Sequence, residues 1–381
     1  MTESARTAVL ADPLRREAIR SLLRRSADAA GFVPFDRFMD IALYGERVGF
    51  YSREDSPFGG QGDYYTAAHA SPLFGRAIAE RIRSVANTLP SGLPFRVVEV
   101  GPGDGTLGET ILATLAGDAT LRGRLEYVLV ERSPTLGARA FERISAAGHS
   151  AGVPVSAAGG VGADGPFRGV IVANEVLDAQ PARRLLWDGE AWREQGVRLA
   201  DDRILDASGP LLRPVPAPAL PHPQEAGVIL EISPTAEGLV REVADHLVSG
   251  LFLVIDYGME ETELLAAHPS GTLASVRRHR STDDPTTDPG NSDLSVFVNF
   301  TRLRAAARAA GLVETAFRRQ AEALGAWGFP SLLEDAIRSA ASPEAEVRVR
   351  LAAKNLLFGF DRFYALELTP PSREGDTARV T

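Results

Sequence analysis

The chain has 381 residues, 44% of them hydrophobic and 24% charged, so it holds enough apolar material for one large folded domain or two smaller ones. Its formal net charge of −9 argues against a dedicated nucleic-acid-binding protein. The absence of cysteine excludes disulfides, thiolate zinc sites, iron–sulfur clusters and a cysteine nucleophile.

The N-terminal sequence predicts neither export nor membrane insertion. It lacks the continuous apolar segment of a secretory signal, and no stretch of the chain approaches the ~20 apolar residues that cross a bilayer. We therefore expect a cytoplasmic protein without a membrane partner.

Residues 1–90 are expected to form a cap of helices and loops. Asp12 followed by Pro13 is typical of a helix start, and apolar residues at helical spacing predict a second helix directly after Pro34. Between residues 45 and 75 this periodicity stops, and glycine and aromatic residues predict an ordered loop. Long ordered loops in compact domains are commonly functional.

From residue 96 onward, short apolar strands alternate with amphipathic helices. The predicted strands cover residues 96–100, 126–131, 153–156, 169–173 and 251–258, and the predicted helices cover 106–116, 134–147 and 234–248. This alternation is typical of an α/β fold in which a parallel, Rossmann-like sheet carries helices on both faces.

An insertion and a C-terminal segment complete the predicted organisation. Residues 183–228 begin with a hairpin that turns at Asp188–Gly189 and continue as a proline-rich run, which we interpret as an insertion into the core. Helices are expected at about 300–311 and 331–355, and a closing strand at 362–368. The predicted division is a cap (1–90), a core (91–315), C-terminal helices with the closing strand (316–369) and a disordered tail (370–381).

The segment VVEVGPGDGTLGETIL (97–112) carries the strongest single signal. A buried strand runs into Gly101, Gly103 and Gly105, and a helix follows directly, so that backbone N–H groups can approach a ligand closely. The third glycine falls one residue too early for the dinucleotide fingerprint G-x-G-x-x-G. Glu99 would repel a pyrophosphate but attract the ammonium group of S-adenosylmethionine (SAM). The motif therefore favours SAM over NAD, with an ordinary tight turn as the alternative.

Further polar residues stand where later strands end, the edge at which open parallel sheets bind ligands. Glu131 ends the second strand, where an acid can bind a ribose diol. Asn174, Glu175 and Asp178 follow the fourth strand, and Asp256 ends the fifth. If the segment after the fourth strand is helical, Glu175 and Asp178 share a face and could grip a cationic acceptor or take its proton. A helix cap with surface charge is the alternative.

Other common catalytic motifs are missing from the sequence. The six histidines show no metal-ligand spacing, so no metal site is expected, and His279 is interpreted as a residue on a strand face. The chain also lacks a phosphate-binding P-loop and the G-x-S-x-G motif of serine hydrolases.

Taken together, these segments resemble the MidA family of class I SAM-dependent methyltransferases. The similarity runs in order through RVGFYSRED, GQGDYYT, EVGPGDGTL, VERSPTL, ANEVLDAQP, LEISP, VIDYG, GTLASVRRHR and DPGNSDLSVFVNF, and it fades from about residue 315. The resemblance implies a class I methyltransferase fold with added helices and loops over the acceptor site. Because mitochondrial members methylate arginine, it also implies a protein arginine as the methyl acceptor.

The resemblance further implies roles for individual residues. Residues of two groups would contact SAM: the loop and strand-end residues already named, and two residues of the GDYYT segment. Together these are Glu99, Gly101, Gly103, Gly105, Glu131 and Asn174, with Asp63 and Thr66. Three acids would lie on the acceptor side as catalytic candidates, namely Glu175, Asp178 and Asp256.

Several positions depart from the family pattern. Ala68 and His69 replace the usual Pro-Glu, and Asp104 replaces an arginine. Phe297 and Asn299 replace a histidine and an aspartate in the region expected to face the acceptor. Three functions therefore stay open: methylation of a protein arginine, methylation of a small-molecule nitrogen or oxygen, and non-catalytic SAM binding by an assembly factor. The prediction allows for a homodimer.

Overall fold

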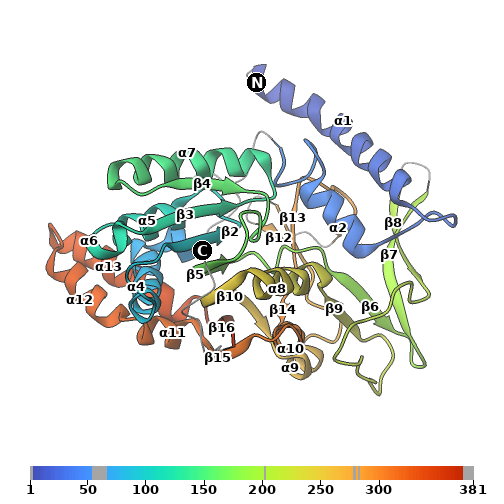
Figure 1. The fold of residues 1–381 in the computed structure, drawn as a ribbon. Coiled ribbons are helices and arrows are strands. Elements are labelled where there is room, and N and C mark those ends of the chain that lie inside the picture. Colours follow the sequence, from blue (N-terminus) through green and yellow to red (C-terminus); the bar gives the residue numbers. More distant parts are fainter. Residues whose placement is uncertain (1–2, 54–66, 201–202, 278–279, 282–283, 372–381) are drawn as a thin grey trace.

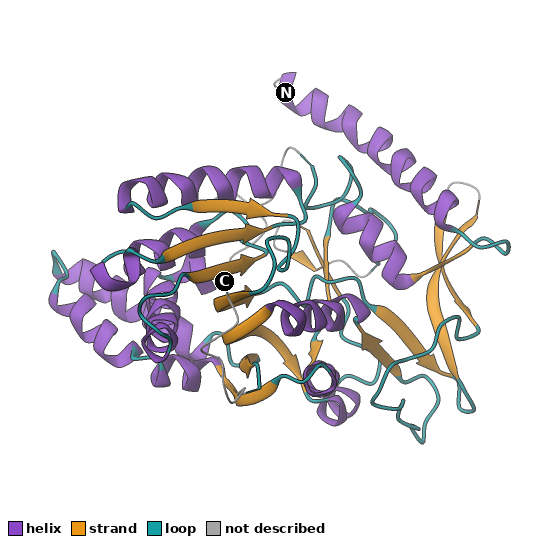
Figure 2. Cartoon of the chain, viewed as in Figure 1, coloured by secondary structure: helices purple, strands orange, loops and turns teal. Residues whose placement is uncertain are grey.

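The computed structural model describes residues 3–53, 67–200, 203–277, 280–281 and 284–371. An eight-stranded sheet forms the centre of the fold, and a five-stranded and a three-stranded sheet accompany it (Figures 1 and 2). None of the helices in the described part of the chain combines the length and the apolar character that a bilayer crossing requires.

The large sheet has the strand order of a Rossmann-like methyltransferase. From one edge to the other it contains β4 (Val155–Ala158), β3 (Leu125–Val130), β2 (Phe95–Val100), β5 (Phe167–Asn174), β10 (Leu247–Met259), β16 (Phe363–Thr369) and β15 (Val313–Arg319), and β14 (Val298–Asn299) pairs with β10. The five strands from β4 to β10 are parallel, and β16 runs antiparallel to both neighbours. The carboxyl ends of five strands therefore meet at one edge, and the predicted α/β class is confirmed.

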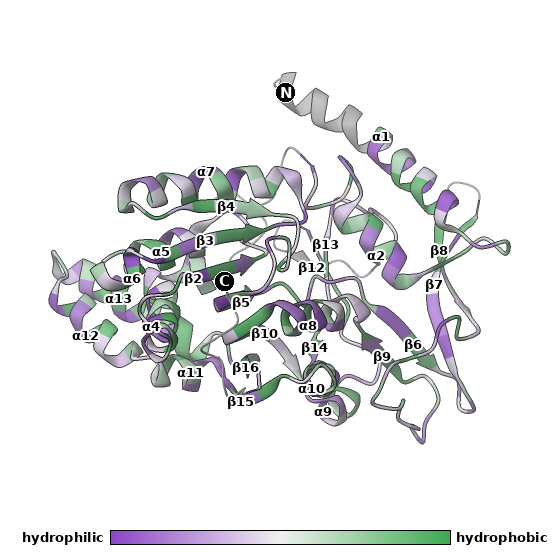
Figure 3. Cartoon of the chain, viewed as in Figure 1, coloured by the Kyte–Doolittle hydropathy of each residue, from purple (hydrophilic) through white to green (hydrophobic). Residues whose placement is uncertain are grey.

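Alternating side chains of these strands build one core on each face. On β10, Leu251 and Leu253 belong to one core, whereas Phe252 and Val254 belong to the other. Six helices contribute side chains to the first core: α4 (Pro72–Thr88), α5 (Thr106–Leu115), α7 (Pro134–Ala151), α11 (Gln320–Ala326), α12 (Phe329–Arg338) and α13 (Pro343–Phe358). The second core receives side chains from α8 (Pro234–His246) and α10 (Phe300–Ala309). Because both faces are covered, the central strands are mostly apolar, and Figure 3 shows them largely in green with some hydrophilic positions in purple.

The predicted insertion and the N-terminal segment share one antiparallel sheet. It contains β1 (Phe32–Pro34), β7 (Trp192–Ala200), β6 (Arg183–Trp187), β9 (Ile229–Ile232) and β8 (Arg203–Gly209), with α1 (Glu3–Ser26) and α2 (Phe35–Tyr44) beside it (Figure 1). The predicted hairpin at Asp188–Gly189 joins β6 to β7. The remaining elements are α3 (Ala67–Ala70), α6 (Ala119–Arg122), α9 (Glu261–Ala267), β11 (Ala274–Arg277), β12 (Arg280–Ser281) and β13 (Asp293–Ser295).

Three helices differ from the sequence prediction. The first helix begins at Glu3, so Pro13 lies inside it and does not start it. The helix predicted at 331–355 is two helices, because Ser342 caps α13 by accepting a hydrogen bond from the backbone N–H of Ala345. The prediction also missed α4, although Ser71 followed by proline is a start signal of the same kind.

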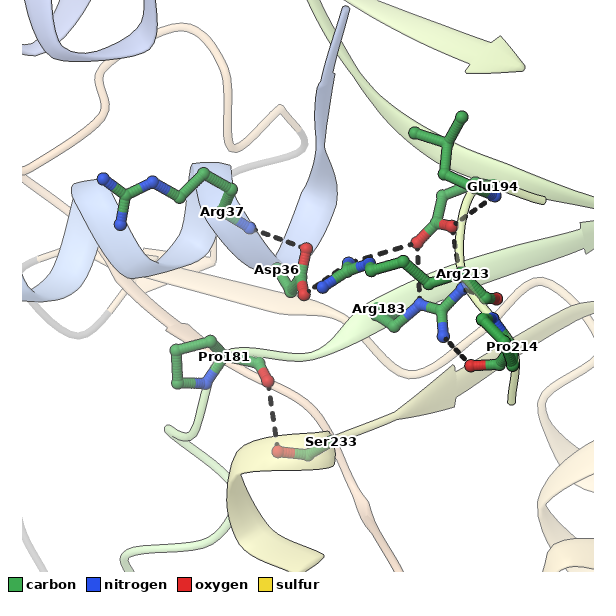
Figure 4. A network of polar contacts seen from close by, with 9 residues as sticks. Asp36, Arg37, Pro181, Arg183, Glu194, Arg213, Pro214 and Ser233 are labelled. Carbon is green, nitrogen blue, oxygen red and sulfur yellow. Dashed lines mark hydrogen bonds and ion pairs between the residues drawn. The ribbon is translucent and has the colours of Figure 1, made fainter. Parts of the chain in front are cut away.

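A network of ion pairs, centred on a buried pair within the inserted hairpin, connects the hairpin to the N-terminal cap (Figure 4). Arg183 on β6 donates two hydrogen bonds of 2.8 Å to Glu194 on β7, and both side chains are almost fully buried. Arg213 lies 3.6 Å from Glu194 and donates at 2.7 Å to Asp36 of α2. These charges connect the small sheet with the helix that borders the cavity described below.

We expect Glu194→Ala to lower the free energy of unfolding by about 3–5 kcal/mol, because the buried Arg183 guanidinium loses its carboxylate. Urea unfolding followed by tryptophan fluorescence measures this change. Glu190→Ala, in the exposed turn of the same hairpin, is the control and should change the free energy by less than about 0.5 kcal/mol. Equal losses in the two variants would contradict a stabilising role for the pair.

Candidate active site

A cavity of about 520 Å³ lies at the carboxyl ends of the parallel strands. Its walls come from the loop after β2, the ends of β3, β4 and β5, one side of α8, and two tyrosines of the N-terminal cap, Tyr44 and Tyr51. A cavity of this volume is typical of small-molecule sites. It lies at the edge where the sequence predicted ligand binding.

The three glycines of the predicted cofactor loop adopt backbone conformations that suit glycine. Gly101, Gly103 and Gly105 have φ values of 64°, 57° and 83°. A Cβ atom at Gly101 would lie 2.7 Å from Cγ2 of Val176, which shows how closely the loop packs on the segment after β5. Gly105 precedes α5, and the first backbone N–H of this helix, that of Thr106, donates a hydrogen bond of 3.0 Å to Oδ1 of Asp104 in the loop.

Glu99 forms part of the cavity wall beneath this loop. Its side chain is buried, and the hydroxyl of Tyr127 donates a hydrogen bond of 2.9 Å to it. Burial raises the pKa of Glu99 to about 7, against the opposing effect of the Tyr127 hydrogen bond. The carboxyl group can therefore ionise in response to a positive charge in the cavity.

Glu131 follows β3 and also lines the cavity. Its carboxylate accepts a hydrogen bond of 2.8 Å from the backbone N–H of Ser133. Burial raises the pKa of Glu131, while hydrogen bonds from the backbone N–H groups of Ser133, Arg132 and Gly103 lower it. These contacts hold the carboxylate beside the glycine loop.

Glu175 follows β5 in a left-handed conformation with φ of 53°, which is uncommon for a residue with a side chain. Its carboxylate accepts hydrogen bonds from the backbone N–H of Ala67 at 3.2 Å and from the amide of Asn174 at 3.3 Å. Burial, followed by the charge of Asp178, raises the pKa of Glu175 to about 8. Glu175 and Asn174 both line the cavity.

Comparison with known proteins identifies the family of this chain. The model of a family described as "Putative S-adenosyl-L-methionine-dependent methyltransferase" matches residues 73–317, which is more than half of the chain. The chain belongs to this methyltransferase family. It is therefore a SAM-dependent enzyme, and the predicted resemblance to MidA methyltransferases is confirmed.

Individual relatives agree with this assignment. A Drosophila melanogaster protein named "Protein arginine methyltransferase NDUFAF7 homolog, mitochondrial" is 28% identical over 320 residues, which cover 76% of this chain and 70% of the relative. The Mus musculus protein named "Protein arginine methyltransferase NDUFAF7, mitochondrial" is 25% identical over 321 residues, which cover 77% of this chain and 71% of the relative. A likely methyl transferase from Burkholderia thailandensis has a crystal structure with bound S-adenosyl-homocysteine, and its sequence is 29% identical to this chain. The match covers 93% of this chain and 92% of the Burkholderia chain, with a TM-score of 0.82.

The charges around the methyltransferase cavity fit SAM. Five of the described lining residues are acids, namely Glu99, Asp104, Glu131, Glu175 and Glu242. Only two of the described lining residues are basic, His69 and Arg132. An acidic lining attracts the sulfonium and ammonium groups of SAM and disfavours a pyrophosphate.

Two predicted catalytic acids of the methyltransferase lie behind the cavity wall. Asp178 and Asp256 are fully buried, and neither is among the described residues that line the cavity. Oδ2 of Asp256 accepts hydrogen bonds from the backbone N–H groups of Val176 (3.1 Å) and Leu177 (2.8 Å). The segment after β5 is a turn and not a helix, so the condition under which Glu175 and Asp178 would share a helical face is not met. Asp256 holds this turn in place.

Two departures from the family pattern contact each other. Nε2 of His69 lies 3.4 Å from Oδ2 of Asp104, and both residues line the cavity. Although burial acts in the opposite direction, hydrogen bonds from His69 and Thr106 hold the pKa of Asp104 well below its usual range. The two substitutions therefore form one pair that connects α3 to the glycine loop.

Ala68 also lines the cavity, whereas the two remaining departures, Phe297 and Asn299, lie away from it. The ring of Phe297 packs against Tyr257 and His268 at centroid distances of 5.2 and 5.1 Å. Asn299 caps α10 by accepting a hydrogen bond of 3.2 Å from the backbone N–H of Arg302. Neither residue is among the described lining residues, so the expectation that both face the acceptor is not supported by their positions.

Some lining residues were not singled out from the sequence. Tyr44 and Tyr51 reach the cavity from the cap, and Glu242 reaches it from α8. The Gly159–Gly160 pair after β4 was a visible signal, because paired glycines after a strand allow close approach to a ligand. The predicted cofactor residues Asp63 and Thr66, and His279, lie outside the described residues.

Proposed function

We propose that this methyltransferase transfers a methyl group to an arginine nitrogen of a protein and that Glu175 contacts the acceptor. The relatives named above as protein arginine methyltransferases support the acceptor class. The observation that carries the proposal is Glu175 itself, a partly buried carboxyl group with a raised pKa, in a strained backbone conformation at the cavity wall. Strained conformations of this kind cluster at functional sites.

Glu175 can orient a guanidinium group and take its proton. A guanidinium ion keeps its proton in water because its pKa is above ~12. A carboxylate in hydrogen-bond contact pairs with the cation, and its Oε1 and Oε2 atoms can accept the proton that leaves the nitrogen. The hydrogen bonds from Ala67 and Asn174 keep the carboxylate in one orientation. When bound, SAM supplies a methyl group whose carbon–sulfur bond breaks as the nitrogen–carbon bond forms, leaving S-adenosyl-homocysteine.

The same proposal assigns cofactor contacts and a supporting residue. Glu131 would bind the ribose diol, and Glu99 would face the positive end of SAM. The backbone of the glycine loop and Asn174 would contact the rest of the cofactor, and Asp63 and Thr66 stay predictions. We propose Asp256 as a positioning residue, because it holds the turn that carries Glu175. A catalytic role for Asp178 stays a prediction, and its charge contributes to the raised pKa of Glu175.

An acceptor assay tests this function. The enzyme is incubated with methyl-labelled SAM and either the protein fraction or the small-molecule fraction of one cell extract, and the labelled protein is hydrolysed for amino-acid analysis. We expect labelled methylarginine from the protein fraction. Label in small molecules alone would favour the small-molecule alternative. SAM binding without transfer to either fraction would favour the assembly factor.

Location and assembly belong to the same set of proposals. The relatives described above carry mitochondrial names, so a cytoplasmic location stays a prediction for this chain. The homodimer, the absence of a nucleic-acid partner and the division into cap, core and C-terminal segment also stay predictions.

A further inference from the structure

His69 and Asp104 connect α3 with the glycine loop. Nε2 of His69 lies 3.4 Å from Oδ2 of Asp104, and only 20% and 19% of the two side chains are exposed. Asp104 has two further partners. Its Oδ1 accepts a hydrogen bond of 3.0 Å from the backbone N–H of Thr106 in α5, and its Oδ2 accepts one of 3.0 Å from Nη1 of Arg143 in α7. Two core helices therefore hold this carboxylate, and its contact with His69 helps to fix the position of α3.

α3 in turn holds the carboxylate of Glu175. The backbone N–H of Ala67, two residues before His69, donates a hydrogen bond of 3.2 Å to Oε1 of Glu175, and Ala67 is fully buried. The amide of Asn174 donates to the same oxygen at 3.3 Å. The backbone N–H of Glu175 donates to the carbonyl oxygen of Ile255 at 2.9 Å. The neighbouring strand therefore holds the backbone of Glu175, while the orientation of its side chain depends on where α3 places Ala67.

The pair exchanges the acidic and the basic position of the family pattern. That pattern has an acid at position 69 and an arginine at position 104, whereas this chain has an imidazole and a carboxylate there. Either difference alone would bring two acids or two basic groups into contact, and like charges in contact repel each other. Because the two differences compensate each other, the contact between the two positions is kept in this chain.

We propose that His69 and Asp104 are positioning residues that hold the Glu175 carboxylate, through Ala67, in the orientation that methyl transfer requires. This inference rests on the proposed role of Glu175. Since Asp104 belongs to the glycine loop, the same contact links the acceptor side of the cavity to the loop expected to hold SAM. A displacement of about 1 Å in a reacting group can cost about 100-fold in rate, so the loss of this contact has a measurable effect.

The first test replaces His69 in the full chain. His69→Ala should lower the single-turnover rate of methylarginine formation in the protein fraction about 10- to 100-fold at saturating SAM. SAM affinity, measured by isothermal titration, should stay within about threefold of the wild-type value. His69→Gln keeps an N–H donor for Asp104 and should retain most of the rate. His149→Ala removes an exposed imidazole of α7 and is the control, with the wild-type rate expected.

The second test asks whether His69 acts through Glu175. In a Glu175→Gln background, His69→Ala should cause less than about a threefold further loss, because two residues that act as one unit are not additive. The same fold-loss in both backgrounds would overturn the inference and would mean that His69 acts on the acceptor directly. A rate that returns to the wild-type value at high SAM concentration would also overturn it and would assign the pair to cofactor binding.

Reversal of the pair is the third test. His69→Glu places two carboxylates in contact and should lower the rate at least as much as His69→Ala. Adding Asp104→Arg should recover at least about tenfold, because the pair then has the polarity of the family pattern. A wild-type rate in His69→Glu, with the fold checked by circular dichroism, would overturn the inference.

These outcomes are distinct from a failure of the proposed function. A wild-type rate in Glu175→Gln would refute the role of Glu175 and the inference with it. A large loss in Glu175→Gln together with a wild-type rate in His69→Ala would overturn the inference alone and leave the proposed function standing.

Discussion

Gly103→Val is expected to reduce SAM affinity at least about 100-fold. Gly103 lines the cavity with φ of 57°, so a β-branched side chain would be strained and would also enter the space of the cofactor. The Gly103 N–H also contacts the Glu131 carboxylate, so a shifted loop would disturb the proposed ribose site as well. Isothermal titration with SAM measures the loss, and NADH serves as a ligand control.

A matched variant separates cofactor exclusion from backbone strain. Gly165 has a similar φ of 81° and open space around its α-carbon, but it is not among the described lining residues. Gly165→Val should therefore carry comparable strain and bind SAM normally. Wild-type affinity in Gly103→Val, with both variants folded by circular dichroism, would mean that SAM binds elsewhere.

Glu175→Gln is expected to lower kcat about 10²–10⁴-fold while SAM affinity changes only a few-fold. The amide keeps the shape of the carboxyl group and can accept from Ala67, but it cannot take a proton or pair with a guanidinium ion. Single-turnover methylation and SAM titration separate the two quantities. Glu237→Gln is the control, since Glu237 also has a pKa raised by burial but is not among the described residues that line the cavity.

The pH dependence of kcat/KM is a second test of Glu175 as the proton acceptor. Because its pKa is raised to about 8, the carboxyl group is protonated below this pH and gains its charge as the pH rises. We expect kcat/KM for a protein acceptor to rise with pH and level off at or below about pH 8, since the positive charge of bound SAM lowers the pKa. The rise should disappear in Glu175→Gln. A flat wild-type profile over this range would exclude Glu175 as the proton acceptor.

Local sequence patterns were sufficient for the central sheet and for the glycine loop. Strands with apolar residues on both faces, such as β2 and β5, can be recognised from a few consecutive residues, and so can a glycine-rich turn before a helix. Glu131 and Glu175 could be placed because the ends of parallel strands meet at one edge. These features depend on contacts within a short segment or on a general property of the sheet.

Features that depend on distant segments could not be predicted in this way. The pairing of Phe32 with Arg198 joins the cap to the insertion, and no local pattern indicates that pairing. Asp256 has the same sequence signal as Glu131, a carboxylate at a strand end. Its carboxylate nevertheless points at backbone N–H groups of the turn after β5 and not into the cavity. Only the three-dimensional packing distinguishes the two acids.

The position of β16 has a consequence for the synthesis of this protein. The strand comprises residues 363–369 and lies between β10 and β15, with backbone pairing on both sides. A nascent chain that has not reached these residues leaves one edge of β10 without its neighbour, and β15 cannot join the sheet. An open strand edge invites pairing with other chains. The growing polypeptide therefore carries an aggregation-prone edge until β16 has left the ribosome.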